Sequence, residues 1–246
     1  MDALTLPQIV YFGVVLILSY AVRGSVGFGG VTVPLLALVM SLKIVVPMVT
    51  FLGLLSSLVI LARDYRHVVW RDTWRILPYS LIGVLAGLYF FKTLDARTLA
   101  HALGIIVLVY GGYSLWITVR PGLNWRPPAK AVPPVAGAIA GFVGTIFGSM
   151  AGMFYAIYLD LLKLDKNEFR ATVAAILFAL GIFRGAGYAA VGAFDRDALI
   201  ACAAALPLMM IGVFLGNHIH ANLNPLAFKR LVALILIASG APLLLR

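Results

Sequence analysis

Apolar residues run along this 246-residue chain in long, unbroken stretches rather than in the alternation typical of half-buried strands. A transmembrane β-barrel would show short segments of period-two alternation, whereas these runs are about 16–24 residues long. A membrane-crossing helix needs about 20 apolar residues, so the pattern predicts an all-α polytopic membrane protein. The expected uninterrupted helices cover residues 44–62, 73–91, 98–119, 171–194, 198–217 and 226–245.

Two further apolar blocks, residues 7–40 and 135–162, are each interrupted by glycine. In the first block, the sequence RGSVGFGG at residues 23–30 leaves pieces of about 16 and 12 residues, each too short to cross the ~30 Å hydrocarbon core. The second block breaks near residues 148–152. Broken backbone at membrane depth is tolerated only where it is shielded from lipid, often lining a cavity. Two such breaks in corresponding positions of two halves indicate the substrate site of a secondary transporter.

The order of a broken block followed by three helices occurs twice. The pattern PxxxxGxxxG at residues 78–87 recurs at residues 207–216, a constant offset of 129. We therefore divide the chain into an N-terminal repeat, a proline-rich cytoplasmic linker and a C-terminal repeat, each repeat being a broken, re-entrant segment plus three transmembrane helices. The glycine pairs within the pattern are most simply read as close helix contacts in lipid. The expected boundaries are 1–120, 121–134 and 135–246.

Composition supports the membrane class. The chain is 63% hydrophobic and 11% charged, whereas soluble domains carry about 25% charged residues. The net charge of +10 does not indicate nucleic-acid binding, because the basic residues stand singly or in small groups between the apolar runs. Lys and Arg in such positions set the orientation of a membrane protein.

The basic residues also discriminate between two topologies. If each broken block crossed the membrane once, the repeats would be parallel and the loop Lys and Arg residues would divide nine against eight. If each block entered and left on one side, the repeats would be inverted and the division would be twelve against five. The positive-inside rule favours inverted repeats with both termini outside. The majority group is Arg63, Arg66, Arg71, Arg75, Arg120, Arg126, Lys130, Lys163, Lys166, Arg170, Lys229 and Arg230, and the minority is Lys43, Lys92, Arg97, Arg196 and Arg246.

Two arginines lie outside these loop groups. Arg184 falls near the middle of its expected helix, where a charge costs at least about 2.5–3.5 kcal/mol, so it should face a cavity or a partner. A guanidinium there can bind two oxygens of an oxyanion, or it can serve as a structural partner of helix-end carbonyls or Asp160. Arg23, beside the first glycines, either makes a second anion contact or only marks the bend.

The two breaks also provide uncharged groups that can bind an anion. A half-helix that starts after Gly30 or Ser149 presents unpaired N–H groups and the positive end of its dipole, and glycine lets a ligand approach closely. The alternative is that the glycines only permit tight packing. The expected substrate-binding residues are Arg23, Ser25, Gly27, Gly29, Gly30, Thr32, Gly148, Ser149 and Arg184.

Acidic residues are nearly absent from the expected spans, and Asp160, at the end of a short segment, comes nearest. Cation transporters and many proton pumps use intramembrane carboxylates, so we expect an anionic substrate. The spacing of His218 and His220 does not place two ligands on one helical face, and no nucleophile–base arrangement stands out. We expect no metal site, no cofactor and no enzymatic activity. The single cysteine, Cys202, is most simply a small buried hydrophobe.

The segment GSVGFGGVTVPLL at residues 24–36 resembles the signature of the TauE/SafE sulfite exporter family, also called the toluene-sulfonate uptake permeases (TSUP). FRAT at residues 169–172, Arg184 and GAF at residues 192–194 resemble the family's second half. The resemblance implies a transporter that moves small organosulfur or organic anions, such as sulfite, sulfonates and sulfoacetate, across the cell inner membrane.

Within that resemblance we expect a secondary transporter working by alternating access, with an anion channel as the alternative. Its partners are then the lipid bilayer and a small anionic substrate, while the coupling ion and a homo-oligomeric state are left open. Met150, Ala151 and Met153 stand where the family often has small residues or proline. This departure predicts a more apolar wall on that side of the site.

Overall fold

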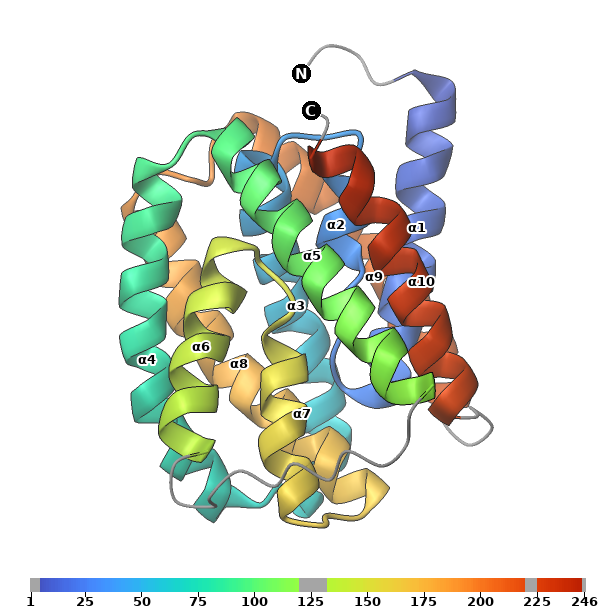
Figure 1. The fold of residues 1–246 in the computed structure, drawn as a ribbon. Coiled ribbons are helices and arrows are strands. Elements are labelled where there is room, and N and C mark those ends of the chain that lie inside the picture. Colours follow the sequence, from blue (N-terminus) through green and yellow to red (C-terminus); the bar gives the residue numbers. More distant parts are fainter. Residues whose placement is uncertain (1–4, 120–131, 220–224, 245–246) are drawn as a thin grey trace.

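The computed structural model describes residues 5–119, 132–219 and 225–244, and all its regular elements are helices (Figure 1). The first half contains α1 (Leu6–Val26), α2 (Thr32–Leu36), α3 (Leu42–Asp64), a 3₁₀ turn η1 (Tyr65–His67), α4 (Trp70–Thr93) and α5 (Ala96–Val119). The second half contains α6 (Val132–Ile146), α7 (Ala151–Leu161), α8 (Lys166–Ala190), α9 (Arg196–Ile219) and α10 (Pro225–Leu244).

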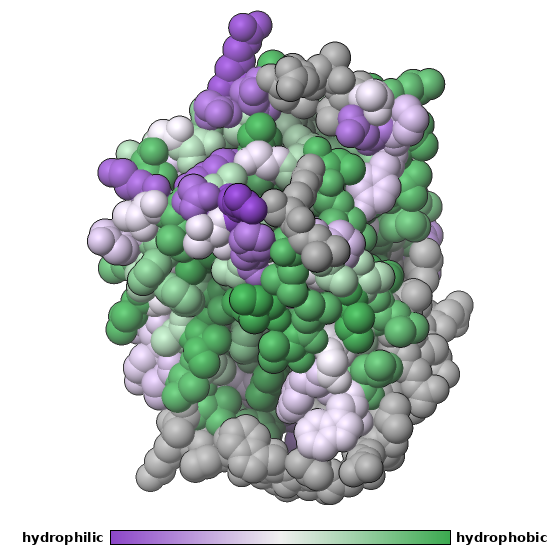
Figure 2. All heavy atoms as spheres, turned by 45° about the horizontal axis from the view of Figure 1, so that its top comes forward, coloured by the Kyte–Doolittle hydropathy of each residue, from purple (hydrophilic) through white to green (hydrophobic). Residues whose placement is uncertain are grey.

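The expected all-α membrane fold is confirmed. Among the described residues, six helices are long and apolar enough to cross a membrane. Large apolar side chains on these helices point outwards, for example Leu85, Val109 and Phe214, which are 70%, 68% and 64% exposed. Figure 2 shows such hydrophobic residues covering the middle of the visible face, with hydrophilic ones gathered towards the upper end. Lipid tails solvate this apolar surface, so the residues need no further burial.

The two halves contact each other through equivalent pairs of helices. α4 packs along α6 and α1 packs along α9, while α3 contacts α8 and α5 contacts α10. By their order in each half, α1 corresponds to α6, α3 to α8, α4 to α9 and α5 to α10. The contact of α4 with α6 is therefore equivalent to that of α9 with α1, and the other two contacts each join a helix to its own counterpart. The repeated glycines sit at these contacts: a Cβ atom on Gly83 would lie 2.1 Å from the carbonyl oxygen of Ala138, and one on Gly212 would lie 2.6 Å from that of Ile17. Their role in the structure is close helix packing.

The course of the helices is consistent with inverted repeats. In Figure 1, α3 runs downwards whereas its counterpart α8 runs upwards, and α5 and α10 are opposed in the same way. The first residue of α1 and the last of α10 lie at the same upper end. Each broken block also begins and finishes at one end, since α3 starts at the end where α1 starts, and α8 starts where α6 starts.

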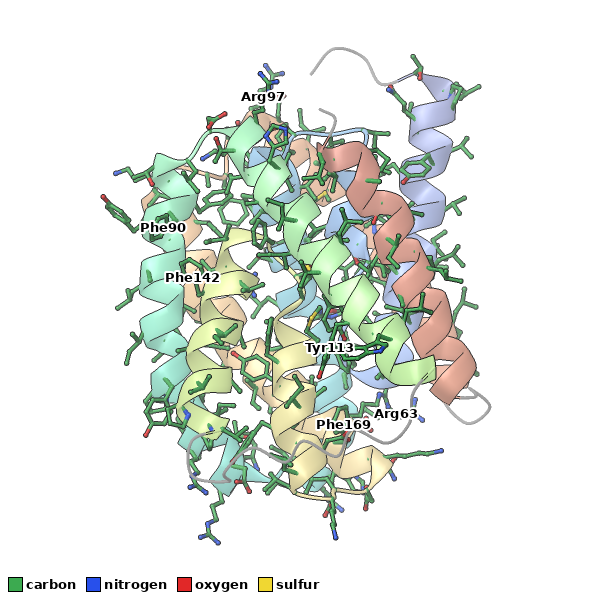
Figure 3. All side chains as sticks on the ribbon, in the orientation of Figure 1. Arg63, Phe90, Arg97, Tyr113, Phe142 and Phe169 are labelled. Atoms are coloured by element: carbon green, nitrogen blue, oxygen red, sulfur yellow. The ribbon has the colours of Figure 1, made fainter. Side chains whose placement is uncertain are left out.

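The described basic residues follow this arrangement. Arg97 lies at the upper end and Arg63 at the lower end (Figure 3). The helix ends and connections at the lower end carry Arg63, Arg66, Arg71, Arg75, Lys163, Lys166 and Arg170, and those at the upper end carry Lys43, Lys92, Arg97 and Arg196. The other members of the two groups (Arg120, Arg126, Lys130, Lys229, Arg230 and Arg246), like His220 and most of the linker, lie outside the described residues and side chains.

The first break lies later in the chain than expected. α1 continues through Arg23 and Ser25 to Val26, and at 21 residues it is long enough to cross a membrane, so the expected piece of about 16 residues is wrong. Gly24 alone does not end the helix, because one internal glycine costs only about 1 kcal/mol. The helix ends at Gly27, whose φ of 91° is left-handed. α2 is five residues long, shorter than the expected piece of about 12.

The second break matches the expected position more closely. Gly148 has a left-handed φ of 68°, and α7 begins at Ala151. α6 starts at Val132, inside the stretch expected to be linker, and takes Pro133 and Pro134 into its first turn. Proline is favoured there, because the first N–H groups of a helix have no intrahelical acceptor.

Candidate anion-binding site

The tips of the two hairpins lie against equivalent helices of opposite halves. A Cβ atom on Gly27 would lie 2.9 Å from the carbonyl oxygen of Arg170 in α8. A Cβ atom on Gly148 would lie 3.0 Å from the carbonyl oxygen of Val46 in α3. Glycine is needed at both positions for two reasons: the backbone is left-handed, and the neighbouring helix approaches too closely for a side chain. They hold the first tip on the second half and the second tip on the first half.

A cavity lies between the tips and the paired helices α3 and α8. Its empty space, counted with its opening, is about 330 Å³. Its walls come from the end of α1 and the first break, from the middle of α3, from the second break and the start of α7, and from α8. The lining residues are Arg23, Gly29, Val49, Thr50, Gly53, Leu54, Gly148, Ser149, Met150, Ala151, Gly152, Leu177, Gly181 and Arg184.

Arg23 enters the cavity from the last turn of α1. Its Nη2 donates hydrogen bonds to the carbonyl oxygen of Gly53 at 3.1 Å and to Oγ of Ser57 at 2.9 Å, both in α3. A Cβ atom on Gly53 would lie only 3.4 Å from that Nη2, so the absence of a side chain makes room for the guanidinium. The Nε of Arg23 is buried and has no hydrogen-bond partner. Neutral groups therefore position Arg23 without balancing its charge.

Arg184 enters the cavity from α8. The residue is only 5% exposed, and its Nη2 donates to Oγ1 of Thr50 at 3.0 Å. Its described partner is this hydroxyl, rather than Asp160 or a helix-end carbonyl. The Nε of Arg184 is also buried without a partner. Thr50 thus fixes the guanidinium and leaves its charge uncompensated.

Arg23 and Arg184 do not occupy equivalent positions in the two halves, but Arg184 lies beside the residue equivalent to Arg23. Since Gly27 and Gly148 occupy equivalent tips, counting back four residues makes Gly144 the counterpart of Arg23. A Cβ atom on Gly144 would lie 3.5 Å from Nη1 of Arg184. The second half therefore has glycine where the first has arginine, and the space beside that glycine receives a guanidinium from α8.

Ser149 adds a neutral donor at the second tip. Its hydroxyl is buried, lines the cavity and has no hydrogen-bond partner. The residues that follow, Met150 to Gly152, also line the cavity as α7 begins. The first N–H groups and the positive dipole end of this 11-residue helix lie at the cavity wall.

Four of the residues expected at the site do not line the cavity. Ser25 donates to the carbonyl oxygens of Ala21 and Gly216, a contact between α1 and α9. Gly27 turns the first tip, Gly30 lies beside Met153, and Thr32 is buried at the start of α2. The cavity brings together the other five: Arg23, Gly29, Gly148, Ser149 and Arg184.

The apolar wall expected from the methionines is present in part. Met150 and Ala151 line the cavity, as do Val49, Leu54 and Leu177. Met153 does not, because its Cε lies near Gly30, 3.7 Å from where a Cβ would be.

Sequence reasoning missed the contribution of α3. Thr50, Gly53 and Ser57 receive the two arginines, and their spacing of three and four residues places them on one helix face. This polar, small-residue stripe inside an otherwise apolar span was the available signal. The apolar run predicts only an uninterrupted helix over residues 44–62, and this prediction gives the stripe no role.

The lining residues include two arginines and no carboxylate. Asp64, the acid at the end of α3, is bound elsewhere: Nη1 of Arg170 donates to it at 2.7 Å, and Nη2 of Arg170 contacts Oδ1 of Asn217. In the part of the chain that the structure describes, no group of three or more His, Cys, Asp and Glu residues could hold a metal ion. The cavity is thus a cationic site with neutral donors and apolar walls.

Two glycine-broken hairpins that enclose a cationic cavity between the halves of a multi-pass helical membrane protein define the architecture of a transporter. The family model described as Sulfite exporter TauE/SafE matches residues 11–243. The chain therefore belongs to the TauE/SafE family of membrane transporters.

A curated relative supports this assignment. The chain is 30% identical over 190 residues to the "Probable inner membrane transporter protein TsaS" of Comamonas testosteroni. The match covers 73% of this chain and 74% of that protein. No solved structure matches the chain.

Proposed function

We propose that the protein is a secondary transporter of small organosulfur or organic anions, of the sulfite, sulfonate or sulfoacetate class, and that it works by alternating access. The name of the relative supports placement in the inner membrane. The family and the relative are both described as transport proteins, so an enzyme is not proposed.

The observation that carries the proposal is the charge of the cavity. Arg184 is buried beside a hydroxyl, Arg23 is anchored by a carbonyl and a hydroxyl, and no acid lines the wall between them. A charge buried without an opposite charge is strongly unfavourable in a low-dielectric interior. An anion in the cavity would relieve this cost, whereas a cation would raise it.

Alternating access follows from the way the tips are held. Each tip lies against a helix of the other half, Gly27 on α8 and Gly148 on α3. Rocking of one half against the other would separate one of these contacts while the other stays closed. The cavity between the tips would then open to one end of the molecule at a time.

Counterflow in proteoliposomes tests the proposal. Vesicles that contain the purified protein and a high internal concentration of unlabelled sulfite or sulfoacetate should accumulate the labelled anion transiently, with saturation. Arg66→Gln serves as a matched control, because Arg66 is an exposed arginine in η1, away from the cavity. Arg184→Gln should lose the counterflow and Arg66→Gln should keep it. Ion conductance far above carrier rates would instead identify an anion channel, and the absence of both signals would refute an anion pathway.

A further inference from the structure

We infer that the preferred substrate is a small dianion, held between Arg23 and Arg184, rather than a monoanion or a zwitterion. The inference rests on the proposed function, because it concerns the charge of the substrate in the same cavity. It follows from the charge balance, the anchoring of the two guanidinium groups and the size of the cavity.

The charge balance of the cavity is +2. Arginine remains protonated in proteins, so both guanidiniums keep their charge. Among the described residues, the ionisable side chains that act electrostatically on Arg23 are Tyr20, which is uncharged at neutral pH, and Arg184. Asp64 is occupied by Arg170 outside the cavity. No carboxylate of the lining therefore offsets either charge.

The two arginines also act on each other. Arg184 is anchored at Thr50 and Arg23 one turn further along α3, at Gly53, so the two like charges repel each other, and the repulsion is strong where the dielectric constant is low. A monoanion between them would leave one positive charge unbalanced. A dianion would balance both charges and would turn the repulsion into two attractions.

The anchoring of the guanidiniums also favours a dianionic substrate. Arg23 and Arg184 each use Nη2 for neutral partners in α3, and the Nε of each has no partner. These partners hold the two groups along one face of α3 without saturating their donors. Together with the unpaired Ser149 hydroxyl, donors from three separate elements surround one space. Such an arrangement fits an anion with three or more oxygens.

The size of the cavity restricts where the two charges can be. Its empty space reaches about 330 Å³ only when the opening is included, so the enclosed part is smaller. Its walls are close: a Cβ atom on Gly181 would lie 3.1 Å from Cδ1 of Leu54. The two charges must therefore sit on one small head group, as in sulfite, or on two groups one carbon apart, as in sulfoacetate.

Two pairs of ligands of matched shape test the inference. Sulfate and methanesulfonate differ by the replacement of one oxygen by a methyl group, and sulfoacetate and sulfoacetamide differ by the replacement of a carboxylate by an amide. Each pair changes the charge from −2 to −1 at nearly constant size. Binding to the purified full-length protein is measured by calorimetry at constant ionic strength and pH. The dianion should bind at least about tenfold more tightly, the scale of one charge-assisted hydrogen bond.

Variants of the two arginines separate charge recognition from a structural role. Arg23→Gln and Arg184→Gln each remove one charge, so each should reduce the preference for the dianion to about threefold or less while the monoanion still binds. Arg66→Gln should keep the preference unchanged. A merely structural role would lower both affinities together and leave their ratio as it was, which would overturn the inference.

The outcomes distinguish this inference from the proposed function. Equal or tighter binding of the monoanion in either pair, with counterflow intact, would overturn the dianion and leave anion transport standing. Binding of neither pair, with no counterflow of sulfite or sulfoacetate, would overturn both. A dianion preference that falls in each arginine variant that folds supports the inference, and one folded variant is sufficient for the test.

Discussion

Arg184 carries a charge that no described acid balances, in a place that is 95% shielded from solvent. It is 5% exposed and its described hydrogen bond goes to the Thr50 hydroxyl. Such a residue is expensive for folding, and replacement of a buried charged group by a well-packed apolar one is often neutral or stabilising. A function that needs the charge explains why the chain carries it there.

Arg184→Met should therefore raise the thermal stability of the ligand-free protein. We expect a gain of about 1–2 kcal/mol, within the range seen for such replacements. For a chain of this size each kcal/mol corresponds to roughly 2–4 °C in Tm. Thermal unfolding in detergent measures it, with Arg66→Met as the control that should change little. A fall in Tm of several degrees would show that Arg184 is a structural residue instead.

Ser149→Ala should separate binding from stability. Because the hydroxyl has no partner in the ligand-free protein, its removal should leave Tm unchanged or slightly higher. Anion affinity should fall by about three- to tenfold, the loss of one hydrogen bond to a charged ligand.

Ser80→Ala is the matched control for Ser149→Ala. The Ser80 hydroxyl accepts a hydrogen bond from Tyr155 and lies outside the cavity. This variant should lower Tm and preserve anion binding. Unchanged affinity in Ser149→Ala would place Ser149 outside the site.

The elements that shape the site are two hairpins, each held by glycine contacts between helices. The pattern at residues 78–87 and 207–216 was visible in the sequence because close packing in lipid requires small residues at fixed spacing. The end of α1 was harder to predict, because Gly24, Gly27, Gly29 and Gly30 look alike in sequence, and only Gly27 takes the left-handed conformation. Tertiary contact with Arg170, remote in sequence, decides which glycine turns the chain.

Gly83→Val should force α4 and α6 apart. The added Cβ would lie 2.1 Å from the carbonyl oxygen of Ala138, which is backbone and has no room to move. We expect a loss of at least about 1–3 kcal/mol, the usual cost of overpacking, seen as a lower Tm. Gly112→Val is the control, because nothing lies within 4 Å of a Cβ atom there. Equal Tm values for the two variants would contradict the helix contact as described.

At the scale of the whole molecule, the two halves contact each other through equivalent helix pairs around one cavity. The duplication and the membrane class could be predicted from apolar run lengths and the 129-residue offset, since both leave a periodic trace in the sequence. The role of α3 was harder to predict, because the stripe of Thr50, Gly53 and Ser57 shows only that one helix face is polar, and its partners Arg23 and Arg184 come from other elements. The stripe is visible in the sequence, but the residues that it binds are remote along the chain and leave no trace beside it.

Orientation in the membrane is testable with single cysteines. The lower end carries the larger group of basic residues and should face the cytoplasm. Leu6→Cys, 75% exposed at the upper end, should react with a membrane-impermeant maleimide in intact cells. Arg66→Cys should react only after permeabilisation. Replacement of the buried Cys202 by alanine removes background labelling, and the opposite labelling pattern would invert the topology.

The affinity of Arg184→Ala for anions tests the central claim most directly. Purified wild-type protein and the variant are titrated with sulfite and sulfoacetate, and binding is followed by the shift in thermal unfolding. If the cavity is the anion site, the wild type should be stabilised by these anions, and the variant should lose at least about tenfold in affinity. Arg66→Ala should behave as the wild type. Unchanged anion affinity in Arg184→Ala would place the site elsewhere and contradict the account.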